Sequence, residues 1–256
     1  MGVKGLFSFL KKWEQPCSLE NERIGIDLFY FLHRSKGDGH VLQELLAPYL
    51  SNEVHFVLDG TAFFARTQER QEELDERRER RKRVWTEVDA LTDAMEQLEE
   101  MDQVHLKKQV QRLERQAWTP SKAYIKEVCE WVESQKASRY TIHQAEGEAD
   151  EYLVQLEREG VLTLVVSNDS DLITGGVKRL MRPYDAVERQ KMCIFDTDFI
   201  RVNLGFNERQ WNDFLWMCKN MREQDVVLAY SLISVYKRLD SAVERWEEVN
   251  GGRLLR

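Results

Sequence analysis

Short apolar runs alternate with longer stretches of helical periodicity along the chain. Three runs rich in β-branched and aromatic residues predict buried strands: RIGIDLFYFL at 23–32, EVHFVLDG at 53–60 and VLTLVVSND at 161–169. Helical patterns fill the intervals between them, which favours a parallel sheet with helices on both faces. The expected fold class is therefore α/β, with a mainly parallel central sheet flanked by helices.

Each predicted strand ends near an aspartate. Asp27 and Asp59 follow the first two strands, and Asp169 and Asp171 follow the third. Ligands of open α/β sheets bind outside the carboxyl ends of the strands, so these acids are expected to converge on one crevice. For the last pair an ordinary polar turn is the competing interpretation, because the flanking residues also favour turns.

Two further acids stand in HQAEGEADEYLVQLE at 143–157. Glu146 and Glu148 would point to opposite sides of a regular helix. They converge only if Glu146 precedes the helix and Glu148 lies in its first turn, an irregular start that Gly147 makes easy. Charge complementarity with the helix dipole is an alternative role, for which Asp150 and Glu151 are also suited.

The collected acids point to a metal site. Six carboxylates in one crevice raise each other's pKa until protons or cations neutralise them. Hard oxygen ligands select Mg²⁺ or Mn²⁺, and two such ions activate water and stabilise the leaving oxygen in phosphodiester hydrolysis. The sequence therefore predicts a two-metal phosphodiesterase site.

The middle of the chain, residues 64–116, contains neither Gly nor Pro and is dense in good helix formers. It predicts two helices with a break around Met101 to Val104. One part carries a run of cations: Arg77, Arg78, Arg80, Arg81, Lys82 and Arg83. A solvated helical hairpin or short coiled coil explains this run, and the alternative is an arm over the crevice whose cations meet phosphates.

Composition narrows the class of protein only slightly. The 256 residues, 42% of them apolar, suffice for one large α/β domain or two small ones. The net charge of −8 argues against a generic cationic nucleic-acid binder. Four cysteines without CxxC spacing indicate intracellular thiols, and no segment resembles a membrane span or a secretion signal. We expect a soluble, intracellular protein that does not bind membranes.

The motifs, taken in order, resemble a known family. MGVKGLFSFLKKW, IGIDLFYFL, FVLDG, AEGEADEYL, SNDSDLI and LGFNERQWNDF are similar to the flap endonuclease (XPG-type 5′-nuclease) superfamily, from Met1 to about Phe214. The resemblance implies a PIN-like fold forming one nuclease-like domain over 1–256. Residues 64–116 would be the family's helical arch, and 207–256 a divergent helical C-terminal region.

The resemblance also implies the site residues. The catalytic acids and ligands of two Mg²⁺ or Mn²⁺ ions would be Asp27, Asp59, Glu146, Glu148, Asp169 and Asp171. Arg66 lies near the family's first catalytic cation, usually a Lys, and Arg77 or Arg78 near the second. Residues implied to bind nucleic acid are Gly2, Lys4, His33, Arg66, Arg77, Arg78, Arg80 and Arg81. His33 stands where members place an aromatic that stacks on a base, and an ordinary helix-face histidine is an equal alternative.

Two departures from the family pattern follow Phe214. The family's G-x-D-Y motif carries a seventh acid, whereas KNMREQD puts Met221 at that position. Glu223, Asp225 and Asp150 are the candidate replacements. There is also no glycine between Gly205 and Gly251, although the family's helix-hairpin-helix element depends on a glycine-rich turn. We expect this duplex grip to be lost, with a partner protein as one way to replace it.

The resulting expectation is a divalent-metal-dependent, structure-specific nuclease acting on DNA as a 5′ flap endonuclease, a 5′-3′ exonuclease or both. Its substrate would be branched or 5′-ended DNA, and the protein would be a monomer. One alternative is an RNA endonuclease of the same superfamily, and another is an inactive, nuclease-derived nucleic-acid-binding or scaffold protein. The expected location is the nucleus or sites of DNA replication, or the cytoplasm for a viral or prokaryotic protein.

Overall fold

The computed structural model describes residues 3–60, 68–96, 103–135, 139–183, 192–221 and 225–250. These residues form a seven-stranded sheet with the strand order β1-β7-β6-β5-β2-β3-β4. The five strands from β6 to β4 run parallel, and β7 is antiparallel to its neighbours β6 and β1. The strands are β1 (Gln15–Pro16), β2 (Arg23–Asp27), β3 (Glu53–Leu58), β4 (Tyr140–Gln144), β5 (Leu164–Val166), β6 (Arg179–Met181) and β7 (Cys193–Asp196). The predicted mainly parallel α/β fold is confirmed.

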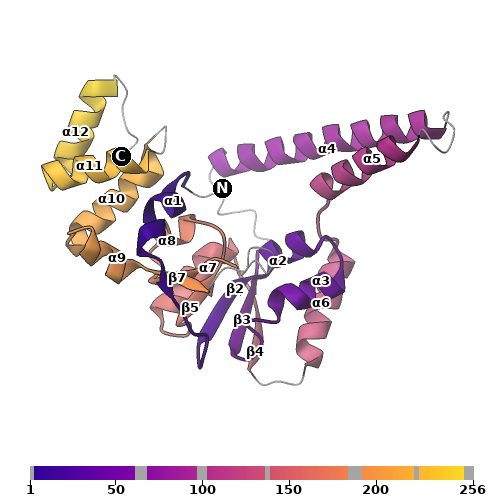
Figure 1. Cartoon of the computed structure of the whole chain (residues 1–256), viewed down its shortest axis with the longest axis horizontal. Coiled ribbons are helices and arrows are strands. Elements are labelled where there is room, and N and C mark those ends of the chain that lie inside the picture. The colour runs from indigo at the N-terminus through magenta and orange to yellow at the C-terminus, as the bar shows by residue number, and fades with distance from the viewer. Residues whose placement is uncertain are drawn as a thin grey trace.

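Helices connect and flank the strands (Figure 1). The helices of the N-terminal part are α1 (Leu6–Leu10), the 3₁₀ turn η1 (Lys11–Trp13), α2 (Leu28–Ser35) and α3 (Gly39–Leu46). The middle of the chain forms α4 (Gln68–Glu96), α5 (Gln103–Ala117) and α6 (Lys122–Ser134). The remainder are α7 (Ala149–Arg158), α8 (Asp171–Gly175), α9 (Thr197–Asn203), α10 (Glu208–Asn220), α11 (Val226–Tyr236) and α12 (Leu239–Asn250). None of the described helices is long and apolar enough to cross a membrane.

The prediction of a single strand over 23–32 is wrong beyond Asp27. β2 ends there, and Oδ1 of Asp27 accepts hydrogen bonds from the backbone N–H groups of Phe29 (2.9 Å) and Tyr30 (3.4 Å). An aspartate in this geometry is a helix N-cap, so the chain turns into α2. The apolar run continues as the buried face of that helix, where Phe31 and Leu32 are almost fully enclosed.

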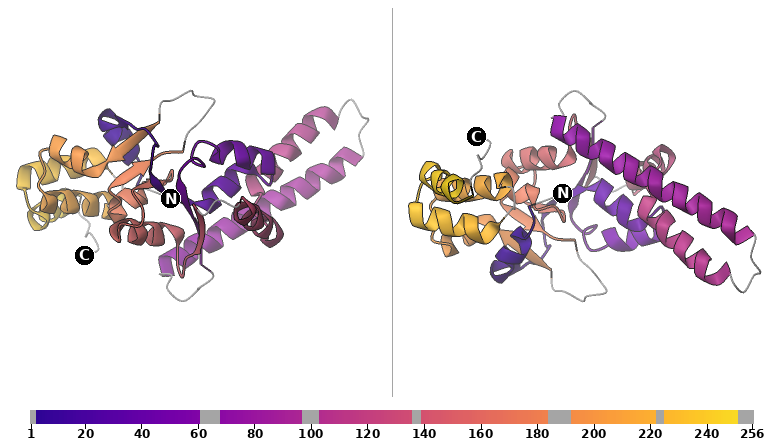
Figure 2. Two further views of the ribbon diagram at one scale, coloured as in Figure 1. Left: turned by 90° about the horizontal axis from the view of Figure 1, so that it is seen from below. Right: turned by 90° about the horizontal axis from the view of Figure 1, so that it is seen from above.

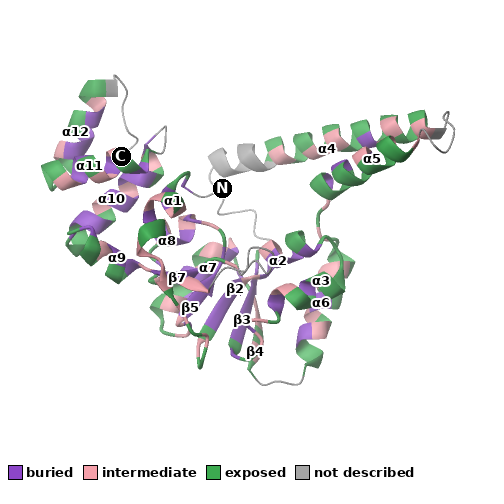
Figure 3. Ribbon diagram, in the orientation of Figure 1, coloured by how far each residue is buried: buried purple, intermediate pink, exposed green. Residues whose placement is uncertain are grey.

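The two faces of the sheet carry separate cores. Ile24, Ile26 and Phe56 pack with residues of α2, α3 and α6 on one face. On the other face Val57 and Val165 pack with α1, α7, α8 and the C-terminal helices. Figure 2 shows the helix groups on opposite sides of the sheet, and Figure 3 shows that the central strands are the most buried part of the fold. Burial on both faces explains why these strands are continuously apolar.

Helices α4 and α5 leave the body as a paired arm (Figure 2). The two helices pack through a small core of Val88, Val110 and Leu113, extended by Val84, Leu91 and Met95. The α4 members follow the alternating spacing of three and four residues that is typical of a coiled-coil seam. The same spacing continued toward the N-terminus of α4 reaches Arg81 and Arg77. The seam therefore changes from apolar to cationic in the half of α4 that lies beyond the core with α5.

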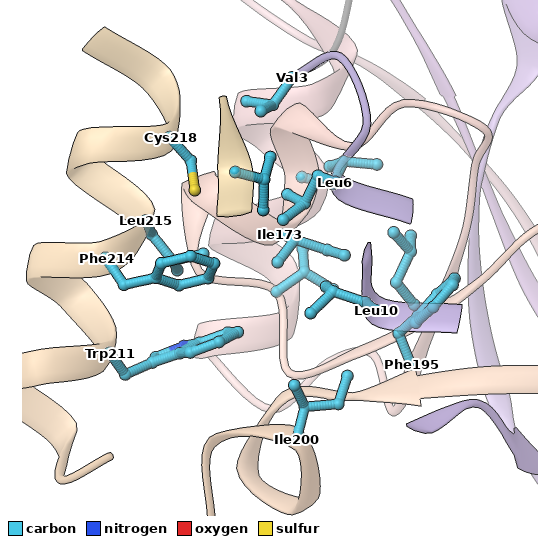
Figure 4. Packing of buried hydrophobic residues seen from close by; sticks show 14 of the residues in the cluster. Val3, Leu6, Leu10, Ile173, Phe195, Ile200, Trp211, Phe214, Leu215 and Cys218 are labelled. Carbon is cyan, nitrogen blue, oxygen red and sulfur yellow. The ribbon is translucent and has the colours of Figure 1, made fainter. Parts of the chain in front are cut away.

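The C-terminal helices are anchored by α10. Its residues Trp211, Phe214, Leu215 and Cys218 point toward α1 and α8 (Figure 4). Asn207 starts α10 with a capping box, in which its side chain and that of Gln210 exchange hydrogen bonds with backbone N–H groups. This region is therefore a well-packed extension of the main core.

Candidate active site

A pocket of about 320 Å³ opens at the carboxyl edge of the parallel strands. It is lined by Asp27 after β2, Asp59 after β3, Glu148 and Asp150 at the start of α7, and Asp169 after β5, together with Ala149 and Arg77. Four of the six predicted acids are thus brought together: Asp27, Asp59, Glu148 and Asp169. They converge because parallel strands end at the same edge of a sheet.

Three of the pocket aspartates each use one oxygen to hold the backbone. Oδ1 of Asp27 caps α2, and Oδ1 of Asp59 accepts a hydrogen bond from Ala149 N (2.8 Å), at the start of α7. Oδ1 of Asp169 accepts one from Asp171 N (2.9 Å), at the start of α8. Among the described residues, the hydrogen bonds of these three carboxylates all use Oδ1. Their Oδ2 atoms, oriented by these bonds, can therefore serve a ligand, and the helix N-termini stabilise the negative charge.

Asp150 differs from its neighbours. Its Oδ1 atom is buried and has no hydrogen-bond partner among the described groups. Burial and then the nearby charges of Asp27, Asp169, Asp59 and Glu148 raise the pKa of Asp150 to about 8. A buried carboxyl oxygen without a partner is unfavourable unless a proton or a cation satisfies it.

Asp27 experiences the same crowding. Burial and the charge of Asp59 raise its pKa to about 7, although the two backbone N–H groups of α2 oppose the rise. Two carboxyl groups in one pocket with raised pKa values indicate a site that favours binding of a positive charge.

The other two predicted acids do not line this pocket. Glu146 is exposed on the loop before α7, and Asp171 is the first residue of α8. Gly60 fixes the loop of Glu146, because its N–H donates to Gly147 O (2.7 Å) and a Cβ there would collide with the carbonyl oxygens of Ala145 and Glu146. Glu148 is the N-cap residue of α7, one position before the predicted first turn.

The cations of the arm divide into two groups. Arg77 lines the pocket, whereas Arg78 is exposed and pairs with Asp75 (3.1 Å). Arg81 donates from Nε to Arg77 O (3.4 Å), and Arg80 is exposed. Of the two candidates for the family's second cation, the structure places Arg77 at the pocket. Arg66, predicted as the first cation, lies outside the described residues, as does Gly2, and Lys4 is exposed near α1.

His33 lies on α2, where charges of both the arm and the pocket act on it. Burial and the cations Lys36 and Arg81 lower its pKa, whereas Asp59 raises it. Its ring meets the ring of Trp118 edge-on, with 5.9 Å between the centroids and 88° between the planes. The sequence had not singled out Trp118, because its proximity to α2 arises only when the arm returns to the body.

The expected position of the seventh acid is part of the core. Met221 is 2% exposed and packs in the core on the α7 side of the sheet. Asp225 caps α11, since its Oδ1 accepts from Leu228 N (3.0 Å), and Glu223 lies outside the described residues. Of the three replacements considered, Asp150 is the one the structure places in the pocket.

The residues of the pocket suit a hard divalent cation. Carboxylate oxygens are the ligands that Mg²⁺ and Mn²⁺ prefer, and the buried Oδ1 of Asp150 lacks the partner that such an ion would supply. No group of three or more His, Cys, Asp or Glu side chains within the described ranges is arranged to hold a metal ion as it stands.

Comparison with known proteins shows what parts of the chain resemble. The family model of the XPG I-region matches residues 140–220, which contain Glu148, Asp150 and Asp169. The predicted resemblance to the XPG-type 5′-nucleases is confirmed over this segment. No curated protein matches the chain by sequence.

Solved structures of Rad2 and GEN1 share the fold. The catalytic core of Rad2 in complex with DNA substrate is 13% identical, with a TM-score of 0.61 over 98% of this chain and 74% of Rad2. Human GEN1 in complex with Holliday junction DNA is 16% identical, with a TM-score of 0.58 over 98% of this chain and 61% of GEN1. GEN1 with product DNA and a Mg²⁺ ion gives 14% identity and a TM-score of 0.51, covering 92% of this chain and 51% of GEN1. At these identities the likeness establishes the fold.

Proposed function

We propose that the protein is a divalent-metal-dependent, structure-specific nuclease that hydrolyses phosphodiester bonds in DNA. The observation that supports this most directly is the pocket itself, which five acidic residues and Arg77 line at the carboxyl edge of the sheet. The fold shared with DNA-bound nuclease cores supports DNA as the substrate class.

In this proposal the acids hold two Mg²⁺ or Mn²⁺ ions. Asp27, Asp59, Glu148, Asp150 and Asp169 would be the ligands, and Asp150 would take the place of the seventh acid that Met221 does not supply. Bound ions would activate a water molecule and stabilise the departing oxygen of the cleaved phosphodiester. Glu146 and Asp171, which the sequence resemblance also implicates, do not line the pocket and would stand outside this ligand set.

Arg77 has a separate role in the proposed reaction. It is a permanently charged cation that lines a pocket of acidic residues. A cation at this position binds a phosphate of the substrate strand and stabilises the charge that develops on that phosphate in the transition state. Arg80 and Arg81 extend the positive charge along α4 and bind further phosphates.

A cleavage assay with purified protein tests the proposal. The substrates are matched 5′-flap, nicked-duplex and single-stranded DNA, together with single-stranded RNA, with Mg²⁺, Mn²⁺ or EDTA. We expect cleavage of DNA that requires metal. The isosteric change Asp169→Asn, which keeps the oxygen that accepts from Asp171 N, should abolish this cleavage. Asp240→Asn, an exposed acid on α12, is the matched control and should leave cleavage unchanged.

Each outcome of the assay has a clear meaning. Absence of cleavage on every substrate would overturn the enzymatic proposal and leave a nuclease-derived binding protein. Preferential cleavage of the RNA would replace DNA as the substrate. Equal activity of Asp169→Asn and the parent protein would show that the pocket is not the catalytic site.

A further inference from the structure

The arm returns to the body at Trp118, one residue after α5 ends at Ala117. Trp118 contacts two helices of the body at this point. Its ring meets His33 of α2 edge-on and meets Tyr124 of α6 at 6.0 Å between centroids and 78° between planes. The hydroxyl of Tyr124 is itself tied to Oγ of Ser35 at the end of α2 (3.0 Å).

The turn after α2 closes around the same ring. Nζ of Lys36 lies 5.8 Å from the Trp118 ring centroid, which is within the range of a cation–π contact. The next residue, Gly37, has a positive φ of 83°, and a Cβ at this position would lie 3.3 Å from Cζ2 of Trp118. The backbone of α2's C-terminal turn is therefore packed against the indole, and the position favours glycine for this reason.

Beyond Trp118, we treat α4 and α5 as one body that would rotate together. α4 and α5 are joined by their common core, in which Val88 meets Val110 and Leu113. Arg77 lies seven residues before Val84, the last apolar residue of the seam. At 1.5 Å per residue it extends about 10 Å beyond that core. A small rotation of the arm at Trp118 would thus move Arg77 out of the pocket.

We propose that Trp118 is a positioning residue that fixes the arm on the body and thereby holds Arg77 in the acidic pocket. Trp118 does not touch the pocket, so its effect on cleavage passes through Arg77. The kinetic part of this inference rests on the proposed nuclease function, whereas the position of the arm can be measured without any activity.

The arm position is measured with two spin labels in the 256-residue chain. Glu76 on α4 and Glu244 on α12 are exposed and are changed to cysteine for labelling, and three partly exposed native cysteines, Cys17, Cys129 and Cys193, are changed to serine. The distribution of distances between the labels is compared for the parent, Trp118→Ala and Trp118→Phe. Trp85→Ala is the matched control, because Trp85 is an exposed tryptophan of the same arm.

We expect Trp118→Ala to broaden the distance distribution or shift its maximum by several ångströms. Trp118→Phe keeps an aromatic ring between α2 and α6, so it should stay close to the parent, and Trp85→Ala should match the parent. Circular dichroism establishes that each variant is folded. An unchanged distribution in folded Trp118→Ala would overturn the inference, whatever the activity of the variant.

Single-turnover cleavage at saturating DNA measures the consequence for the reaction. Displacement of a group by about 1 Å lowers rates by on the order of 10²-fold, so Trp118→Ala should slow cleavage to this extent and Trp118→Phe should recover most of it. In an Arg77→Ala background, Trp118→Ala should cause little further loss, because the group that it positions is absent.

The remaining outcomes separate this inference from the proposed function. A full additional loss from Trp118→Ala in the Arg77→Ala background would show that Trp118 acts by another route and would overturn the link to Arg77. If the parent protein cleaves no substrate, the nuclease proposal fails and the distance distributions alone decide whether Trp118 fixes the arm.

Discussion

The acidic pocket and helix α10 differ in what they bury: the pocket buries carboxyl groups, whereas α10 buries apolar side chains. In the pocket, Asp150 has a buried oxygen without a partner, and burial together with neighbouring charges raises its pKa. In α10, the residues that face the body are apolar and interlock with α1 and α8, so Trp211 and Phe214 are nearly or fully enclosed. Repulsion between the carboxylates of the pocket lowers the free energy of unfolding, whereas apolar burial at α10 raises it.

We expect the pocket to serve ligand binding and α10 to serve the stability of the fold. Charges that repel each other are retained where a positively charged ligand can satisfy them, and such sites are characteristic of binding and catalysis. A close-packed apolar cluster offers no such chemistry, and its removal is expected to change only the folding equilibrium. The two regions should therefore respond to substitution in contrasting ways.

The largest expected effect is the loss of cleavage on changing Asp169 to Asn. Asn keeps an oxygen for Asp171 N but removes a negative charge from the pocket. A loss of several kcal/mol of transition-state stabilisation corresponds to a fall in rate on the order of 10³-fold. Single-turnover cleavage measures it, and urea unfolding should show nearly parental stability. A large loss of stability would contradict the separation of the two regions.

The converse experiment is Phe214→Ala in α10. Removing a fully buried aromatic side chain should lower the free energy of unfolding by about 3–5 kcal/mol. Urea denaturation measures this loss, and Val227→Ala, an exposed apolar residue of α11, is the control that should change little. The folded fraction of Phe214→Ala should bind Mn²⁺ as the parent does. A change in that affinity would show that α10 supports the pocket directly.

A smaller effect is expected for Asp150→Asn in metal-free protein. The pKa of Asp150 is raised from 3.8 to about 8, so between these values the native state binds more protons than the unfolded state. Stability of the parent must therefore fall as pH rises through this range. The variant should lack this component and be more stable by about 1–3 kcal/mol at pH 8.5 in EDTA, with little difference at pH 4.

The same variant sharpens the comparison in the presence of metal. If Asp150 is a ligand, Asp150→Asn should bind Mn²⁺ more weakly, and saturating Mn²⁺ should stabilise the parent more than the variant. Isothermal titration and unfolding in Mn²⁺ measure both quantities. Equal affinity of the two proteins would leave Asp150 as a buried acid without a role in metal binding.

The smallest expected effect belongs to Arg80→Ala on the exposed surface of α4. Exposed charges contribute less than about 1 kcal/mol to stability, so unfolding should not change. Loss of one phosphate contact should reduce the salt dependence of DNA binding by about one unit of slope, whereas Arg77→Ala should mainly slow cleavage. Binding measured at two salt concentrations tests this, and an unchanged slope would make Arg80 a solvated surface residue.

The sequence by itself determined the strands and the acids that follow them. Continuous apolar runs predicted β2, β3 and β5. Asp27, Asp59 and Asp169 follow these strands at the carboxyl edge of the sheet, which is where α/β folds bind their ligands. The helical arm was also predictable, since residues 64–116 lack the breakers Gly and Pro. The start of α2 inside an apolar run was missed, although Asp27 before it is a recognisable capping signal.

Tertiary structure alone decided which side chains share a space. Whether Arg77 or Arg78 reaches the pocket depends on how α4 is rotated against α5, and Asp150 becomes an unpartnered acid only because α7 starts against the ends of three strands. Trp118 contacts His33 and Tyr124 only because the chain returns from the arm to the body. Trp118 and His33 are 85 residues apart in the sequence. Such contacts depend on distances between elements, and local patterns of polarity contain no information about those distances.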